Sequence, residues 1–276
     1  MPLLRTGSNK GIGLETVRQL ASKGVKVVLT ARDEKKGLEA VQKLKDSGLS
    51  DLVIFHQLDV ANPGSIASLA DFIKTQFGRL DILVNNAGIV QERPSTVPKK
   101  STQTYESVKE CVETNYDGAI RTTEALIPLL QLSDSPRIVN VASSASKFVV
   151  DIPNELARGV FTDPKNLTEE NVEEVLSEFL KDFKEGSLET KGWGHSSAYV
   201  LSKAALNAYT KILANRYPSF CINCVCPGLV KTDINWNTSK VPVEEGAAHP
   251  VRLALLPKGG PSGLFFVQQE VSPFLS

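Results

Sequence analysis

The stretch TGSNKGIG, residues 6–13, decides how the rest of the chain is interpreted. It lies between a short apolar run and a helix predicted over residues 14–22, and the next predicted strand begins at Val25. Glycines let a backbone turn sharply and approach a pyrophosphate, whose charge then lies at a helix N-terminus. Glycines also occur in ordinary turns, so this interpretation depends on the surrounding helix and strand. The GxxxGxG spacing differs from the common GxGxxG fingerprint.

Beyond this stretch, apolar runs alternate with amphipathic runs. Strands are predicted at residues 25–31, 52–58, 80–85, 137–142 and 220–226, and helices at 33–47, 65–77, 105–130 and 197–216. Continuous apolar strands that alternate with helices indicate a parallel sheet covered on both faces. The predicted fold class is therefore α/β, a Rossmann-type doubly wound sheet in one domain over residues 1–276. In the first of these helices, Leu38, Val41 and Leu44 are predicted to share the buried face.

Residues 148–195 interrupt this alternation and are rich in acidic side chains. Residues 168–184 predict an amphipathic helix, with Thr168 as the N-cap and acidic residues in its first turn. Its expected apolar face carries Val172, Val175, Phe179 and Phe183. We interpret this segment as an insertion packed on the main domain, before Tyr199, and not as a second domain.

The first strand is short, because only Pro2-Leu3-Leu4-Arg5 precedes Thr6. Pro2 lacks a backbone donor, and Arg5 is charged at a position where an aliphatic residue is expected. We expect the folded protein to be less stable for this reason. Weaker ligand binding at the glycine stretch is a second consequence to test.

The composition excludes several classes of function. Lys and Arg number 31, as do Asp and Glu, whereas a nucleic-acid binder usually has a basic excess. No apolar stretch is long enough to span a bilayer, and no signal peptide pattern is present. We therefore expect no nucleic-acid or membrane partner and a cytoplasmic location.

Three of the four cysteines, Cys221, Cys224 and Cys226, cluster in FCINCVCPG. Their spacing fits no common zinc pattern, and no histidine lies nearby in the sequence. The surrounding residues are apolar, so we predict cysteines packed in a buried strand and no metal site. Reduced thiols again favour the cytosol.

Two features indicate a nucleotide and its type. Residues 85–88, NNAG, follow a predicted strand and would form one wall of a cofactor cleft. Arg32 ends the second predicted strand, where an acidic residue would select NAD, and it can instead pair with a 2′-phosphate. Lys10 could add a second positive charge. We therefore predict NADPH, although Arg32 could also be a solvated residue at a helix start.

Tyr199 and Lys203 lie four residues apart on a predicted helix and therefore share a face. A nearby ammonium stabilises tyrosinate and lowers the phenol pKa. Such a phenol can donate a proton to a carbonyl oxygen as hydride reaches the carbon. Tyr/Lys pairs at this spacing also occur by chance on solvated helices, so the weight of this pair depends on its context.

The whole set of motifs closely resembles the short-chain dehydrogenase/reductase family over nearly the entire chain. It comprises TGSNKGIG, NNAG, Asn115, Ser143, Tyr199-xxx-Lys203 and Pro227-Gly228 in strand–helix order. The resemblance implies that Tyr199 is the general acid, and that Lys203 lowers its pKa and holds the nicotinamide ribose. Ser143 would hydrogen-bond the substrate carbonyl, with Ser144 as the alternative if the register slips by one. Asn115 would position a water that links Lys203 to solvent.

The resemblance also implies which residues bind NADPH. Glycine-stretch residues would contact the pyrophosphate, Asp59 and Val60 the adenine, Asn86 a ribose, and Thr232 the nicotinamide amide. The full predicted set is Gly7, Asn9, Lys10, Gly11, Ile12, Gly13, Arg32, Asp59, Val60, Asn86, Ala87, Gly88, Tyr199, Lys203, Pro227, Gly228, Val230 and Thr232.

Within the family, the wide gap from Ser143 to Tyr199 and the tail EEGAAHPVRLALLPKGGPSGLFF resemble the plant menthone/neomenthol and salutaridine reductases. This implies NADPH-dependent, reversible reduction of a ketone on a small lipophilic substrate such as a monoterpenoid. The resemblance also implies a monomer, since the inserted helix covers a surface that other members use to oligomerise. Alternatives are an alkaloid ketone reductase, an enone C=C reductase, and a cofactor-binding protein without turnover. One relative that reduces a C=C bond has Glu at the tyrosine position, so Tyr199 favours carbonyl chemistry.

Four apolar residues flank the catalytic segments. Phe148, Val149, Trp193 and Trp236 could line a substrate pocket, and each could equally belong to the core.

Overall fold

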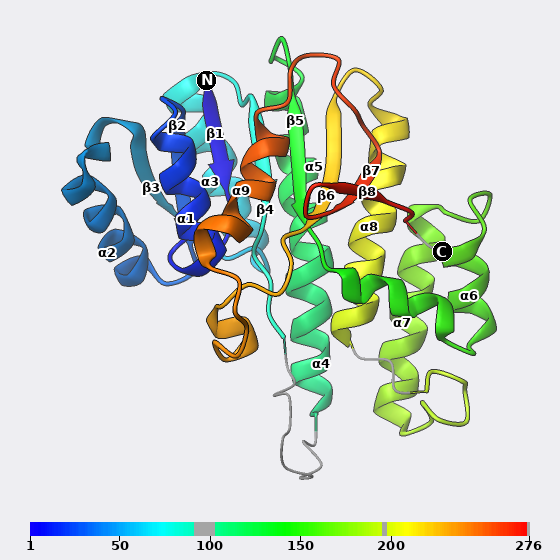
Figure 1. The fold of residues 1–276 in the computed structure, drawn as a ribbon. Helices are drawn as coiled ribbons and strands as arrows, with labels where there is room; N and C mark the ends of the chain where they lie inside the picture. The colour runs from blue at the N-terminus through cyan, green and yellow to red at the C-terminus, as the bar shows by residue number, and fades with distance from the viewer. Residues whose placement is uncertain (91–102, 195–197, 275–276) are drawn as a thin grey trace.

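The computed structural model describes residues 1–90, 103–194 and 198–274, which form one eight-stranded sheet with helices on both faces (Figure 1). The strand order is β3-β2-β1-β4-β5-β6-β7-β8, and every neighbouring pair is parallel except β7 and β8. The strands are β1 (Pro2–Arg5), β2 (Lys26–Ala31), β3 (Val53–Gln57), β4 (Ile82–Asn85), β5 (Arg137–Val141), β6 (Cys221–Cys226), β7 (Leu264–Val267) and β8 (Glu270–Ser272). The predicted doubly wound parallel sheet is confirmed.

The longer helices also follow the predicted order. They are α1 (Gly11–Ala21), α2 (Glu34–Leu44), α3 (Pro63–Phe77), α4 (Tyr105–Val112), α5 (Gly118–Leu130), α6 (Glu155–Thr162), α7 (Glu169–Glu185), α8 (Ala198–Arg216) and α9 (Val243–Ala254). The helix predicted over residues 105–130 is divided by a π-helical turn, η3 (Glu113–Asp117), between α4 and α5. The sequence patterns did not predict α6, α9, β7 or β8. Ser197, at the predicted start of the helix that became α8, lies outside the described residues.

Successive side chains along the strands point to opposite faces of the sheet and join two hydrophobic cores, one on each face. Leu4 and Leu83 join one core, which also takes side chains from α3, α4, α5, α7 and α8. Leu3 and Val84 join the opposite core, with side chains from α1, α2 and α9. Burial on both faces explains why the strands are mostly apolar.

The predicted buried face of α2 is wrong at one position. Leu38 is 53% exposed, whereas Val41 and Leu44 are buried as predicted. Gly37 and Ala40 complete the buried face instead. A Cβ at Gly37 would overlap the ring of Phe55, so the helix lies against β3 through a glycine, and this rotates Leu38 towards solvent. A count of apolar residues cannot detect such a contact.

The insertion forms two helices, α6 and α7, that pack on each other, and α7 also packs on α4 and α8. Thr168 caps α7 by accepting a hydrogen bond from the Asn171 backbone N–H, as predicted. Val172, Val175 and Phe179 are buried, and Phe183 is partly buried. Trp193 closes this region: its ring lies 5.3 Å from that of Phe179, and its Nε1 donates to the buried carboxylate of Asp182 at 2.8 Å.

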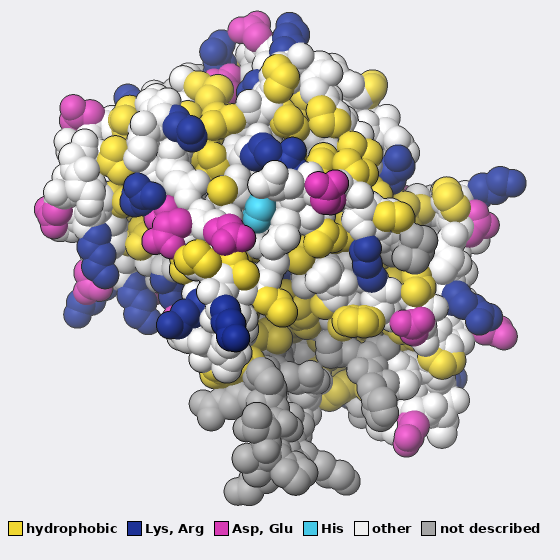
Figure 2. All heavy atoms as spheres, in the orientation of Figure 1, with side chains coloured by type: hydrophobic (Ala, Val, Ile, Leu, Met, Phe, Trp, Pro, Cys, Tyr) yellow, Lys and Arg dark blue, Asp and Glu magenta, His cyan; other side chains and the backbone are white. Residues whose placement is uncertain are grey.

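The cysteine cluster lies in a strand, because Cys221, Cys224 and Cys226 all belong to β6 and are buried as free thiols. On the face shown in Figure 2, Lys and Arg side chains are interspersed with Asp and Glu over much of the surface. Within the described ranges, no helix combines the length and apolar composition needed to cross a bilayer. The cytoplasmic location stays a prediction.

Arg5 places a cation inside the sheet, at the last position of the central strand β1. Its side chain is fully buried, and Nη2 donates to Asn86 Oδ1 at 2.8 Å. Among the described residues, Nε and Nη1 find no hydrogen-bond partner. Burial lowers the pKa of Arg5 to about 9, because a low-dielectric interior disfavours the charged form.

We predict that Arg5→Val raises the melting temperature. The substitution removes a buried, incompletely paired charge, and replacing such groups by apolar residues is often stabilising by about 1–4 kcal/mol. The loss of the donor to Asn86 offsets about 1 kcal/mol of that gain. Thermal unfolding measures the change, with Arg5→Lys as the control that keeps a charge in the strand. A melting temperature at or below that of the wild type would show that Arg5 does not destabilise the sheet.

Candidate active site

A cleft of about 850 Å³ opens at the carboxyl ends of the parallel strands. Strand order reverses between β1 and β4, and such a switch point is where open α/β sheets bind their ligands. Every residue predicted from the sequence to bind the cofactor lines this cleft, and so do Ser143, Tyr199 and Lys203. Asn115 is the exception and lies behind the wall. Ser144, the alternative to Ser143, is not among the lining residues.

The glycine loop, residues 6–13, packs so closely at Gly7 and Gly13 that neither position has space for a side chain. Gly7 has a φ of 61°, and a Cβ there would lie 2.8 Å from the Ala87 Cα. A Cβ at Gly13 would overlap the carbonyl oxygen of Gly7. Lys10, the N-cap of α1, makes no side-chain capping bond. The loop therefore presents a helix N-terminus without a side-chain cap to the cleft, which fits a pyrophosphate.

Asn86 and Thr6 hold this loop against the NNAG segment. Asn86 Nδ2 donates to the carbonyl oxygens of Thr6 at 3.0 Å and Gly7 at 2.8 Å. In return, Thr6 Oγ1 accepts from the backbone N–H groups of Asn86 and Ala87. The Asn86 amide is thus engaged within the protein, and its predicted contact with a ribose stays a prediction.

The basic side chains that line the cleft include one from the glycine loop and two from the end of β2 and the start of α2. Arg32 and Lys10 line it as predicted, and Lys36, which the sequence analysis missed, joins them. Arg32 forms an exposed ion pair with Glu110 at 3.4 Å, and Lys10 pairs with Asp233 at 2.7 Å. Exposed pairs of this kind are weak and exchange readily with other anions. The residues present therefore fit a nucleotide that carries a 2′-phosphate.

Asn115 lies in the π-helical turn η3 and is fully buried. Its Oδ1 accepts from the Ile89 backbone N–H at 2.8 Å, and its Nδ2 donates to the Ile89 carbonyl oxygen at 3.0 Å. Nδ2 also lies 3.1 Å from Ser202 Oγ on α8. Asn115 thus fixes the segment after β4 against α8, beside the cleft. Its predicted water-positioning role stays a prediction.

The candidate catalytic side chains converge from β5 and α8. Tyr199 shares a side-chain hydrogen bond with Ser143, whose Oγ also accepts from the Ala145 backbone N–H at 3.2 Å. Lys203 Nζ donates to the Val141 carbonyl oxygen at 2.9 Å and lies 5.9 Å from the centre of the Tyr199 ring. The helical spacing of four residues therefore brings phenol and ammonium to one end of the cleft.

Burial shifts both of these groups towards their neutral forms. It raises the pKa of Tyr199 to about 12, which the hydrogen bond from Ser143 only partly counteracts. It lowers the pKa of Lys203 to about 8. The net pKa of Tyr199 is thus raised, with desolvation of the phenol as the largest cause. The predicted lowering by Lys203 stays a prediction.

The apolar candidates divide between core and cleft. Val149 and Trp193 are fully buried in the core, and Phe148 is 63% exposed and does not line the cleft. Only Trp236 lines it. The sequence analysis missed several lining residues that follow β4 and β6, including Ile89, Val90, Lys231, Asp233 and Ile234. Their position directly after NNAG and Pro227-Gly228 was the available signal.

Comparisons with known proteins agree with this geometry. The profile of the family described as short chain dehydrogenase matches residues 3–152 and 186–242. A (+)-neomenthol dehydrogenase of Arabidopsis thaliana is 54% identical, over 98% of this chain and 96% of the relative. The solved salutaridine reductase of Papaver somniferum is 49% identical, with a TM-score of 0.89 over 96% of this chain and 99% of that one. The solved menthone neomenthol reductase of Mentha piperita is 50% identical, with a TM-score of 0.86 over 98% and 99%.

We predict that Gly13→Ala weakens dinucleotide binding by about tenfold or more, because the added methyl group must displace the Gly7 carbonyl that shapes the loop. Calorimetric titration measures the dissociation constant. Gly159→Ala is the matched control: it also lies in a helix, α6, and its added Cβ meets nothing within 4 Å. Equal affinities in the two variants would mean that the close packing at Gly13 does not shape the binding loop.

Proposed function

The chain belongs to the short-chain dehydrogenase family, and from this premise we propose that it uses NADPH to reduce a ketone on a small lipophilic molecule. A monoterpenoid ketone of the menthone type is the proposed substrate, and the reverse reaction would oxidise the alcohol. One observation carries the proposal: Tyr199, Ser143 and Lys203 line the same cleft as the glycine loop and Arg32. A single cleft therefore offers a proton donor and a nucleotide site.

The cleft supports NADPH as the cofactor. The glycine loop and the N-terminus of α1 would hold the pyrophosphate, and Arg32, with Lys10 and Lys36, would hold the 2′-phosphate. Asp59 and Val60 line the part of the cleft assigned to the adenine, and Thr232 the part assigned to the nicotinamide. When bound, the reduced nicotinamide supplies a hydride to the carbonyl carbon.

The proposed role of Tyr199 is to donate its phenol proton to the carbonyl oxygen as negative charge develops there. With a pKa of about 12 the phenol is protonated at neutral pH, so it is always ready as an acid. Ser143 would hydrogen-bond the same oxygen and hold the phenol in place. Lys203, mostly protonated at pH 7, would stabilise the tyrosinate that remains after the transfer.

The lining beside these groups supports a lipophilic substrate. Ile89, Val90, Ile234 and Trp236 present apolar surface to the cleft, and apolar walls with a few polar groups are typical of small-molecule sites. An alkaloid ketone would fit the same description, in line with the similarity to salutaridine reductase. Tyr199 favours a carbonyl over an enone C=C bond, since its proton is delivered to oxygen.

We further propose that the protein acts as a monomer. Helix α7 packs on α4 and α8, the helices that bring η3 and Tyr199 to the site. This contact covers the face that a second subunit would otherwise need.

Purified protein should consume NADPH with menthone, and Tyr199→Phe should reduce kcat by about 10²–10⁴-fold, the usual contribution of general acid catalysis. NADPH affinity should change little, because only a hydroxyl is removed. Absorbance at the nicotinamide band and a parallel binding titration measure the two quantities. Turnover that survives in Tyr199→Phe would remove Tyr199 as the acid. NADPH binding without turnover of any ketone, alkaloid ketone or enone would favour a binding protein.

The pH dependence of reduction should report Lys203. Because burial lowers the pKa of Lys203 to about 8, the ammonium is present below pH 8 and is lost as the pH rises through that value. We expect kcat/KM to be flat near pH 6–7 and to fall about tenfold per pH unit above pH 8. Lys203→Arg keeps its charge at all these pH values and should remove the fall, although its activity will be lower. A flat wild-type profile up to pH 10 would contradict this role.

A further inference from the structure

The segment Thr232–Asn237, here called the strap, follows β6 and forms one wall of the cleft. All six of its residues line the cleft, including the apolar side chains of Ile234 and Trp236. Trp236 and Asn237 are consecutive non-glycine residues with φ values of 55° and 58°. This left-handed conformation is rare for a bulky residue and persists only where the surroundings enforce it.

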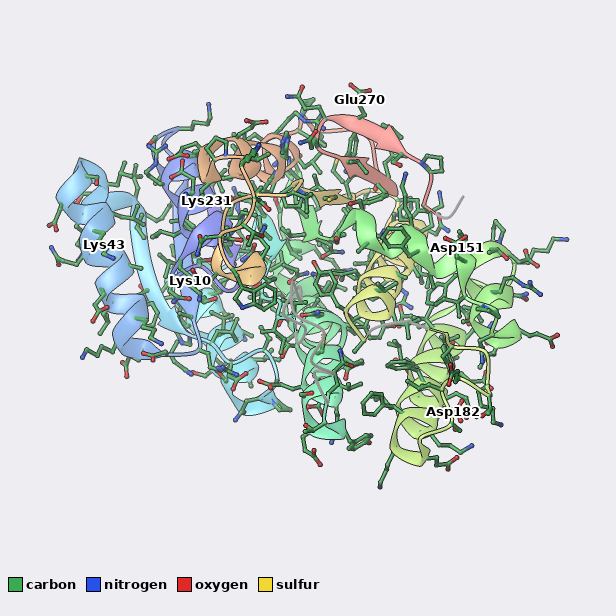
Figure 3. The ribbon with its side chains drawn as sticks, turned by 60° about the horizontal axis from the view of Figure 1, so that its bottom comes forward. Lys10, Lys43, Asp151, Asp182, Lys231 and Glu270 are labelled. Carbon is green, nitrogen blue, oxygen red and sulfur yellow. The ribbon has the colours of Figure 1, made fainter. Side chains whose placement is uncertain are left out.

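The carboxylate of Asp233 supports this turn from one side and the glycine loop from the other. Its Oδ1 accepts from Asn237 Nδ2 at 3.2 Å, and its Oδ2 accepts from Lys10 Nζ at 2.7 Å. The Asp233 backbone carbonyl also accepts from the Trp236 N–H at 3.1 Å. Figure 3 shows Lys10 beside the short helical turn (orange) that Asp233 begins. One carboxylate thus bridges two segments that are 223 residues apart in sequence.

The other side-chain hydrogen bonds of the strap lie within it or on its flanking residues. Asn235 Nδ2 donates to the Val230 carbonyl oxygen and to Ser239 Oγ, which fixes the strap to its own flanks. The ion pair of Asp233 with Lys10 instead reaches the glycine loop. The hydrogen bonds from Lys10 and Asn237, together with the positive charge of Lys10, hold the pKa of Asp233 below its usual range, so the carboxylate is charged at neutral pH. The ammonium of Lys10 has three donors, and the bridge uses one of them.

We propose that Asp233 is a positioning residue that ties the strap to the glycine loop and thereby sets where Trp236 and Ile234 meet the ketone. The inference rests on the proposed function, because it assigns the strap to the substrate side of the same cleft. Both partners of the bridge are exposed, at 66% for Lys10 and 61% for Asp233, so the coupling is modest and sensitive to salt.

The test compares Asp233→Asn with the wild type. Asparagine has nearly the same shape but no charge for Lys10. KM for menthone, or for the best ketone found, should rise about two- to fivefold, which is the range of an exposed ion pair. kcat should stay near the wild-type value, and KM is measured at saturating NADPH because Asp233→Asn frees a Lys10 donor that is also proposed for the 2′-phosphate. Glu178→Gln is the matched control, because it removes a carboxylate from another exposed pair, with Lys181 on α7.

A second readout needs no turnover. The chain has two tryptophans, of which Trp193 is fully buried and Trp236 lines the cleft. Acrylamide quenching of the fluorescence therefore reports Trp236, with Trp236→Phe as the baseline. Asp233→Asn should increase the quenching constant because release of the strap exposes the indole of Trp236, and Glu178→Gln should leave it unchanged.

Increased quenching together with a raised KM supports the proposal. Unchanged quenching overturns it, and so does increased quenching with an unchanged KM, or an equal effect in Glu178→Gln. If the wild type reduces no ketone, the proposed function fails, and the quenching result alone still decides whether Asp233 holds the strap.

Discussion

The close approach of the glycine loop to the NNAG segment is the constraint on which the rest of the site depends. At Gly7 and Gly13 the backbone leaves no space for a Cβ, and the amide of Asn86 fills the remaining gap by bonding two loop carbonyls. This contact joins the ends of β1 and β4, the two strands between which the strand order reverses. The cleft opens at this point because the connections on either side lead away in opposite directions. The positions of α1, Arg32 and the opposite wall all follow from it.

The wall of the cleft that carries Tyr199 and Lys203 depends on a different balance, between burial and charge. Burial raises the pKa of Tyr199 to about 12, so the phenol is neutral before the reaction, and it lowers the pKa of Lys203 to about 8, so Lys203 is still mostly an ammonium at pH 7. That arrangement suits a transient charge, because an electrostatic interaction is strongest where water is excluded. Asn115 contributes by rigidity: it fixes both backbone polar groups of Ile89 and reaches α8 through Ser202. The π-helical turn η3, which carries Asn115, interrupts the regular helix between α4 and α5. Such turns are frequent at functional sites.

The sequence predicted most of the fold and the residues of the cleft that belong to recognisable motifs, but it missed many other lining residues, and the failures share a physical cause. Glycine spacing, strand periodicity and the Tyr199–Lys203 interval are local patterns, so they can be recognised without coordinates. The exposure of Leu38 and the net direction of the Tyr199 pKa shift depend on what lies opposite in space. The sequence left open whether Trp193 belongs to the core, and the packing of the insertion decides it. Thr232 and Trp236 were named from the sequence, but the turn that joins them was missed for the same reason: its left-handed residues Trp236 and Asn237 carry no glycine to indicate it. One partner that supports the turn, Lys10, comes from the other end of the chain.

Two buried cations in this protein illustrate how position decides whether a charge is useful. Lys203 has lost its hydration shell, but it faces the cleft, where a negative charge would form during the proposed reaction, and the Val141 carbonyl holds it in place. Arg5 has lost its hydration shell as well, yet it contacts only the Asn86 oxygen and leaves two nitrogens without a partner. Because Asn86 supports the glycine loop, the charge of Arg5 lies one hydrogen bond away from the nucleotide site. The stability of the central strand and the order of the loop are thus coupled through one amide, so a change at Arg5 acts on both.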